Sequence, residues 1–104
     1  MTFLVCLIYN IRLRVLLRLA LMAEEEALAR RFGELVKRLR YEQVLSQEDF
    51  SFRVGLHQTY VSSVERGKRN VTLGTADRIA RALGTTLSTM ISEIERDREE
   101  STGS

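Results

Sequence analysis

The sequence is short of the residues from which most catalytic and metal sites are built. It has one cysteine, Cys6, and one histidine, His57, and it lacks proline and tryptophan altogether. A lone cysteine excludes a disulfide framework and a cysteine-based metal site, and a lone histidine excludes a histidine cluster. No Ser/His/Asp or Cys/His set is available and no glycine-rich phosphate loop occurs, so we expect neither an enzyme nor a cofactor. A reducing cytoplasm is the expected setting.

The charge is nearly balanced, because the formal net charge is only +2, and bulk charge therefore does not identify a nucleic-acid partner. Its distribution says more. Residues 30–69 hold nine Lys/Arg against five Asp/Glu, whereas residues 93–100 hold five acids against two arginines. A basic middle with acidic flanks suits a DNA-facing surface, although an ordinary solvated charge pattern explains the same counts about equally well.

The stretch 46–55 has the signals of a short helix and its two ends. Ser46 is a good N-cap, and Asp49 stands three residues on, where a capping box places an acid. Phe50 and Val54 fall on one helix face at i, i+4. Gly55 follows at once, where a helix end needs a left-handed residue without a Cβ penalty.

A second short helix is expected from about His57 to Glu65. Leu56 enters the core ahead of it, and Val61 and Val64 point inward at i, i+3. Two short helices joined by a tight turn make a helix-turn-helix, whose second helix presents polar groups to a DNA groove.

This part of the chain resembles the Cro/phage-repressor (XRE) family of DNA-binding domains. The matching segments are 45–49, 54–56 and 60–70, and the resemblance covers about residues 32–90. Residues 59–62 and 65–70 are most similar to the controller proteins of restriction–modification systems, although His57 stands where Ser or Asp is commoner. The resemblance implies a bacterial or phage-like, nucleoid-associated regulator that binds double-stranded DNA.

Side chains near the start of the second helix are the candidates for reading base edges. They are Gln58, Thr59, Ser62 and Ser63. A glutamine pairs in bidentate fashion with an adenine edge, and a threonine offers a hydroxyl to bases and a methyl to thymine.

Phosphate contacts are expected on both sides of these base readers. The candidates are Gln47, His57, Tyr60, Arg66, Lys68, Arg69 and Asn70. The resemblance supplies the roles of Gln47, at a helix N-terminus, and of the basic loop 66–70. We interpret His57 first as a helix cap, and Glu65 as structural rather than base-reading.

Residues 1–22 form an apolar segment interrupted by Arg12, Arg14 and Arg18. These arginines argue against a membrane span, and they follow the apolar run instead of preceding it as in a signal peptide. Polar and apolar residues alternate from Asn10 to Val15, which is a strand period, but leucine and alanine further on also allow a helix. Three hypotheses stay open: an added strand or helix used in dimerisation, a membrane-surface amphipath, or a translated upstream stretch without function, with initiation at Met22.

Three further helices complete the expected fold. The first runs from about Glu24 to Tyr41 and carries an apolar stripe. The next is capped by Thr72 and ends at Gly84, and the last is capped by Thr85 or Thr86. The inward residues of the first two are Leu28, Phe32, Leu35, Val36 and Leu39, then Leu73, Ile79, Ala80 and Leu83.

An apolar ridge on the last helix suggests a surface for a second copy of the chain. Its members are Leu87, Met90, Ile91 and Ile94. Plain core packing of this helix is the alternative, and the polar tail 99–104 is expected to be disordered.

The fold class that follows is all-α: a compact five-helix repressor-like domain over 23–98, with an N-terminal extension (1–22) and a tail (99–104). The expected function is sequence-specific transcriptional regulation by a homodimer on a pseudo-palindromic operator. No small-molecule ligand is expected. The alternative is a protein-interaction module of the same fold, an antitoxin or a co-activator scaffold.

Overall fold

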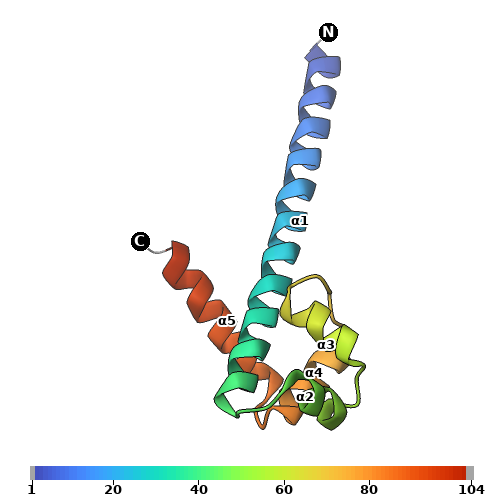
Figure 1. Ribbon diagram of the computed structural model, residues 1–104. Helices are drawn as coiled ribbons and strands as arrows, with labels where there is room; N and C mark the ends of the chain where they lie inside the picture. The colour runs from blue at the N-terminus through green and yellow to red at the C-terminus, as the bar shows by residue number, and fades with distance from the viewer. Residues whose placement is uncertain (1, 103–104) are drawn as a thin grey trace.

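The computed structural model describes the backbone of residues 2–102 and the side chains of residues 2–100. Over this range the chain is a set of α-helices, which confirms the all-α prediction. The helices are α1 (Thr2–Glu42), α2 (Gln47–Val54), α3 (Gln58–Glu65), α4 (Leu73–Ala82) and α5 (Leu87–Thr102). The C-terminal half of α1 packs into a bundle with the other four helices, whereas its N-terminal half projects from the bundle alone (Figure 1).

Helix α1 is one continuous helix, so the expected start near Glu24 is wrong. Of the strand and the helix that the sequence left open over residues 10–15, the helix is the one formed. No proline interrupts residues 2–42, the first glycine is Gly33, and leucine, alanine and arginine are strong helix formers. The alternation covers only six residues, and the segments on both sides of it consist mostly of helix formers, so the helix continues through it. Within residues 2–102 no helix is both long enough and apolar enough to cross a membrane.

The helix-turn-helix has the caps that the sequence predicted. The hydroxyl of Ser46 accepts a hydrogen bond from the backbone N–H of Asp49 at 3.0 Å. Gly55 takes a left-handed φ of 74°, a conformation that costs a residue without a Cβ nothing. Helix α3 then begins at Gln58, with His57 as its N-cap.

Helices α4 and α5 begin at threonine caps. Thr72 Oγ1 accepts from the N–H of Thr75, and Thr86 Oγ1 accepts from the N–H of Thr89, each at 3.2 Å. The first residue of α4, Leu73, is 80% exposed, so its expected inward position is wrong. It precedes the inward face of α4, which starts one turn later at Ala76.

The expected disorder from Glu99 is wrong for residues 99–102, because α5 continues through Thr102. Residues 103 and 104 lie outside the described part. An ion pair at 3.4 Å between Arg98 and Glu24 ties this end of α5 to α1, and a second at 3.5 Å joins Arg98 to Glu95 within the helix. These ion pairs help to keep the end of α5 helical, although its polar composition predicted disorder.

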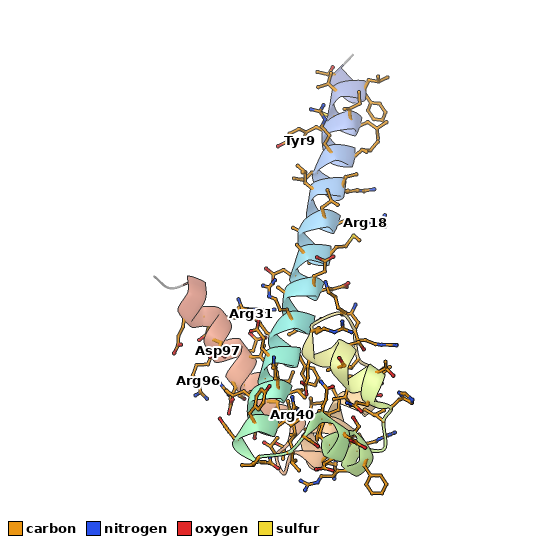
Figure 2. The ribbon with its side chains drawn as sticks, viewed as in Figure 1. Tyr9, Arg18, Arg31, Arg40, Arg96 and Asp97 are labelled. Atoms are coloured by element: carbon orange, nitrogen blue, oxygen red, sulfur yellow. The ribbon has the colours of Figure 1, made fainter. Side chains whose placement is uncertain are left out.

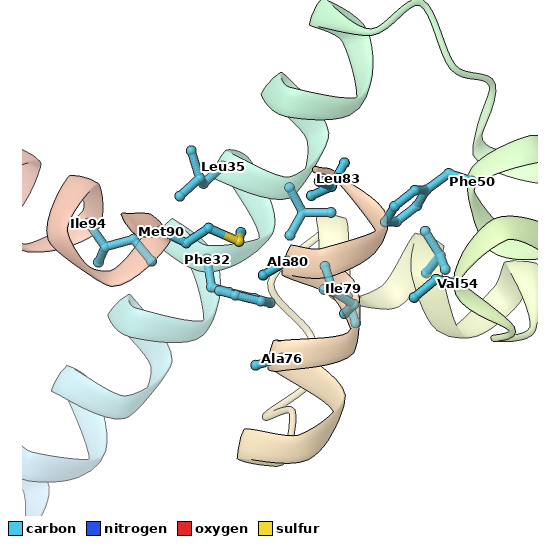
Figure 3. Close-up of a cluster of buried hydrophobic side chains, with 13 residues drawn as sticks. Phe32, Leu35, Phe50, Val54, Ala76, Ile79, Ala80, Leu83, Met90 and Ile94 are labelled. Carbon is cyan, nitrogen blue, oxygen red and sulfur yellow. The ribbon is translucent and has the colours of Figure 1, made fainter. Parts of the chain in front are cut away.

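One apolar core lies where the five helices meet (Figure 3). Its members are Phe32, Leu35, Val36, Phe50, Val54, Val61, Val64, Ala76, Ile79, Ala80, Leu83, Met90 and Ile94. Met90 and Ile94 are only 1% and 2% exposed within a single chain, so they are not free to meet a partner. This part of the expected dimer ridge is corrected: α5 supplies core residues because α1 and α4 leave a gap that it fills.

Helices α1 and α3 approach each other closely at Gly33. A Cβ added there would lie 2.1 Å from the Val64 carbonyl oxygen and 3.0 Å from the Glu65 carbonyl oxygen. Real Cβ atoms do not tolerate such contacts, so α1 and α3 touch only because residue 33 is glycine.

Gly33→Ala should therefore lower the free energy of unfolding by about 2–3 kcal/mol or more, since backbone has to move to admit the methyl group. Gly74→Ala is the matched control, because a Cβ there meets nothing within 4 Å. It should stabilise α4 by about 0.5–1 kcal/mol. Urea unfolding measures both, and equal effects of the two substitutions would contradict the close approach.

Candidate nucleic-acid interface

The turn between α2 and α3 is held by a side chain from α4. Arg78 donates from Nε to the Val54 carbonyl oxygen at 3.1 Å and from Nη2 to the Gly55 carbonyl oxygen at 2.8 Å. The last carbonyls of a helix lack intrahelical partners, and a cation there also complements the helix dipole. Arg78 thus fixes the direction in which α3 leaves the turn.

The far end of α3 is held by a buried ion pair. Arg40 on α1 donates to Glu65 from Nε at 2.8 Å and from Nη2 at 3.0 Å, and the two side chains are 7% and 3% exposed. The hydrogen bonds from Glu65 raise the pKa of Arg40 above its ordinary value, against the lowering effect of burial. The expectation that Glu65 is structural is confirmed.

Two further contacts extend this ion pair to α2. Arg40 also donates from Nη1 to the Leu45 carbonyl oxygen at 2.8 Å, and the side-chain amide of Gln47 donates to Glu65 Oε1 at 3.2 Å. One network therefore joins α1, α2 and α3 and sets the position of Gln47. An amide NH₂ group carries two hydrogens, so Gln47 keeps one donor for an outside acceptor.

A shallow polar groove opens at the N-terminal end of α3. It is lined by Gln47, His57, Gln58, Thr59 and Ser62. Gln58 and Thr59 are exposed, and Ser62 is half-buried. The structure therefore brings three of the four predicted base readers together with two of the predicted phosphate contacts.

His57 acts as the predicted cap and also orients its neighbour. Its Nδ1 accepts from the backbone N–H of Thr59 at 3.3 Å and contacts the Thr59 hydroxyl. Because Nδ1 accepts the backbone hydrogen, the hydroxyl must donate to it as well. The methyl group and lone pairs of Thr59 then remain for an outside partner.

Arg69 in the loop after α3 is held against α3 itself. Its guanidinium lies 4.6 Å from the centre of the Tyr60 ring, and its Nε donates to Ser63 Oγ at 3.2 Å. Ser63 in turn donates to the Tyr60 carbonyl oxygen at 2.7 Å. The Ser63 hydroxyl is thus engaged on both sides and lies outside the polar groove, where it holds Arg69 in place.

The rest of the basic loop is exposed on a fixed backbone. Arg66, Lys68 and Asn70 are all exposed, and Arg66 Nε reaches back to the Ser62 carbonyl oxygen at 3.3 Å. Gly67 has a φ of 71°, and a Cβ there would lie 2.7 Å from the Cα of Arg30. The loop backbone therefore packs directly on α1 while its cations face outward.

The surface offers hydrogen-bond donors and acceptors flanked by positive charge. Among residues 2–102 no group of three His, Cys, Asp or Glu side chains is placed to hold a metal ion. What the surface can do is bind a polyanion and read polar edges presented to it.

A second surface feature is an apolar groove between α1, α4 and α5. It is lined chiefly by Leu28, Phe32, Leu73, Ala76, Leu87 and Ile91, and the loop 69–72 forms one side. Ile91 is 39% exposed and Leu87 is partly buried, so these two residues of the expected ridge reach the surface. Sequence periodicity identified the α5 residues of this groove, whereas it placed Leu28 and Leu73 in the core, although they are 38% and 80% exposed.

Residues 36–90, more than half of the chain, match the family described as Helix-turn-helix. The chain belongs to this helix-turn-helix family. It is 48% identical over 68 residues to the control protein C.MunI of a Mycoplasma species, a match that covers 64% of this chain and 92% of that protein. The predicted resemblance to the repressor family and to controller proteins is confirmed.

Solved structures of helix-turn-helix proteins share the fold. The restriction–modification controller protein C.AhdI from Aeromonas hydrophila superposes with a TM-score of 0.57 at 39% identity, over 60% of this chain and 94% of that one. The controller C.Esp1396I, solved as a tetramer in complex with its natural 35 base-pair operator, gives 0.62 at 26% identity, over 66% and 91%. All three of these relatives are control proteins rather than enzymes.

Three residues that position the interface were not found from the sequence: Arg40, Arg78 and Gly33. The first two are arginines within helices, where a solvated side chain is the commoner state, and no local signal marks their long-range partners. Arg40 and Glu65, at the end of α3, are 25 residues apart in the sequence, so their ion pair becomes visible only in the folded structure.

Glu65→Ala should cost about 3–5 kcal/mol of stability, because it leaves the Arg40 charge buried without its partner. Asp77→Ala is the matched control: it removes the exposed pair with Arg81, whose side chain is 76% exposed. That change should cost less than about 1 kcal/mol. Thermal unfolding followed by circular dichroism compares them, and a small loss for Glu65→Ala would contradict the proposed role of the network.

Proposed function

We propose that this protein is a controller-type transcriptional regulator that binds a specific double-stranded DNA operator as a homodimer. The observation that carries the proposal is the polar groove at the start of α3, which lies beside an outward-facing basic loop. An α-helix fits the major groove of B-DNA, where each base pair presents a distinct pattern of donors and acceptors. Such a regulator acts where the chromosome lies, in the cytoplasm of a bacterial cell.

Base reading is assigned to Gln58, Thr59 and Ser62. Gln58 is exposed and makes no hydrogen bond to another described side chain that would have to be broken before it met an adenine edge. Thr59 keeps its methyl group for a thymine, because His57 fixes its hydroxyl. Ser63 is assigned to holding Arg69 in place and not to base reading, because its hydroxyl already donates one hydrogen bond and accepts another.

Phosphate binding is assigned to the residues that border the polar groove. Gln47 offers its second amide hydrogen at the N-terminus of α2, where the helix dipole also favours an anion. Arg66, Lys68, Arg69 and Asn70 form the second border, with Tyr60 beneath Arg69. These contacts fix the register of the protein on DNA, and the base readers supply specificity.

The partner surface is assigned to the apolar groove between α1, α4 and α5. Leu73 and Ile91 expose apolar surface there, and contiguous exposed apolar patches mark interaction sites. A two-fold dimer makes the two copies of α3 equivalent, so the operator should be a pseudo-palindrome. Its half-sites should lie about 10 base pairs apart, one turn of the duplex.

Gln58→Ala should cost about 1–3 kcal/mol on the preferred operator and little on random DNA. Arg69→Ala should weaken binding to both DNAs alike and lower the salt slope by about one. Arg96→Ala, an exposed arginine on α5 far from α3, is the charge control and should change neither (Figure 2).

Selection from a random DNA pool supplies the preferred operator for these measurements. Equal losses on both DNAs for Gln58→Ala would remove it from the base readers. No sequence preference at all would reject the operator function and leave a protein-interaction module.

Ile91→Glu should disrupt the dimer formed by the helix-turn-helix domains and weaken operator binding strongly, because it buries a charge in an apolar interface. Ser92→Glu, an exposed neighbour on the same helix, is the matched control. A second measurement tests the two-fold symmetry of the dimer. Lengthening the spacer between the half-sites by about five base pairs, half a turn, should weaken binding, because the two copies of α3 then face different sides of the duplex. Undiminished binding to that operator would contradict a two-fold dimer.

A further inference from the structure

The ring of His57 and the hydroxyl of Thr59 form a closed local pair at the start of α3. Nδ1 of His57 accepts the backbone N–H of Thr59 at 3.3 Å, and the Thr59 hydroxyl makes a shorter contact with the same nitrogen. Both residues are exposed, and both line the polar groove that the proposed function assigns to DNA. The pair therefore lies where a base edge meets the protein.

These two contacts fix the positions of the hydrogens. A backbone N–H can only donate, so Nδ1 is unprotonated and the neutral ring carries its hydrogen on Nε2. The Thr59 hydroxyl has to turn its own hydrogen toward Nδ1, because the lone pairs of the oxygen and the nitrogen would otherwise face each other. The only hydrogen of this hydroxyl is thus used within the protein, and only the oxygen lone pairs stay available.

A hydroxyl that can only accept distinguishes base edges that a free hydroxyl does not. A free serine or threonine hydroxyl donates as well as accepts, and it therefore suits any base. In the major groove adenine presents its N6 amino group and cytosine its N4 amino group as donors, whereas guanine O6 and thymine O4 are acceptors. An acceptor-only Thr59 can pair with the amino groups, but it places lone pair against lone pair at guanine or thymine.

The same ring has a second hydrogen-bonding group that DNA can use. Since Thr59 occupies Nδ1, the group of His57 that stays available is Nε2–H, a donor suited to a phosphate oxygen. A phosphate bound to Nε2–H favours the tautomer in which Nδ1 accepts. His57 in this way links a contact to the DNA backbone with the hydrogen-bonding direction of a base reader.

We propose that His57 is a positioning residue for base reading, which makes Thr59 an acceptor-only reader that prefers adenine or cytosine on the strand it contacts. The proposal rests on the proposed function, because it takes Thr59 to be a base reader. Reversing the base pair removes the preferred group, since the opposite base then presents its acceptor at that place. The methyl group of Thr59 takes no part in this hydrogen bond and stays free for a thymine.

Binding of operator variants to the full chain tests the proposal. Each position of the selected operator is varied to all four base pairs, and the position at which Thr59→Ala changes the preference is the one that residue 59 contacts. In the unmodified protein, adenine or cytosine should bind there about fivefold or more tighter than guanine or thymine, because the latter leave a polar group unpaired.

Two substitutions of His57 separate the direction of the hydrogen bond from helix capping. Glycine is tolerated at an N-cap but offers no acceptor side chain, so His57→Gly should free the hydroxyl hydrogen and reduce the preference to about twofold or less. His57→Asp is the matched control, because a carboxylate also caps the helix and only accepts. Its charge should weaken binding to all operators alike while the preference at this position stays.

A double substitution tests whether His57 acts through Thr59. Thr59→Val keeps a methyl group but removes the hydroxyl, so it should abolish the preference for amino groups. Adding His57→Gly to Thr59→Val should then cause no further change at this position. The preference at the position that Gln58 reads should stay the same in all these variants, which excludes a general displacement of α3.

An unchanged preference in His57→Gly overturns the proposal while the operator function stands, and so does a preference of the unmodified protein for guanine or thymine. A loss in His57→Asp as large as that in His57→Gly also overturns it, since the acceptor then does not set the preference. An equal loss at the Gln58 position assigns His57 to the support of the whole helix instead. If Thr59→Ala alters no position, the proposal fails together with the base-reading role of Thr59, whereas a chain without any sequence preference rejects the operator function itself.

Discussion

The buried ion pair between Arg40 and Glu65 is the constraint on which the DNA-facing surface depends. Two charges taken out of water cost several kcal/mol each unless their hydrogen bonds are satisfied. Here two hydrogen bonds join Arg40 to Glu65. Arg40 also donates to the Leu45 carbonyl oxygen, and Glu65 also accepts from the Gln47 amide. Because the partners come from three helices, the energy that keeps the charges buried also keeps α1, α2 and α3 in one relative position.

A surface that reads DNA has to leave polar groups unsatisfied and yet hold them still. The chain meets these two needs with different residues. Arg40, Glu65 and Arg78 use their hydrogen bonds inside the fold, and Gln58 and Lys68 keep theirs for the outside. Arg69 stands between the two groups, because Tyr60 and Ser63 hold it in place while its charge stays exposed, which reduces the entropy lost on binding.

Local chemistry was predictable from the sequence, and long-range contacts were not. The caps at Ser46 and Thr72 and the left-handed Gly55 follow from neighbouring residues, so their signals lie within four positions. Gly33 and Arg78 act on backbone far away in the sequence, which no local pattern encodes. The ridge of α5 was recognised as apolar, but its period does not tell whether the same chain or another one covers it, and Met90 proved to be core.

Helix α1 carries no hinge between its two ends. From Thr2 to the glycine at position 33, whose φ is helical, nothing in the chain allows a bend, so the helix behaves as a stiff rod rather than as a tether. A flexible tether lets a second binding event occur over a range of distances, whereas a rod permits it at one distance and one angle. Any contact made by the N-terminal half of α1 therefore also sets the distance and angle between the helix-turn-helix domains that it joins. It thereby sets the spacing of the DNA sites that these domains can occupy together.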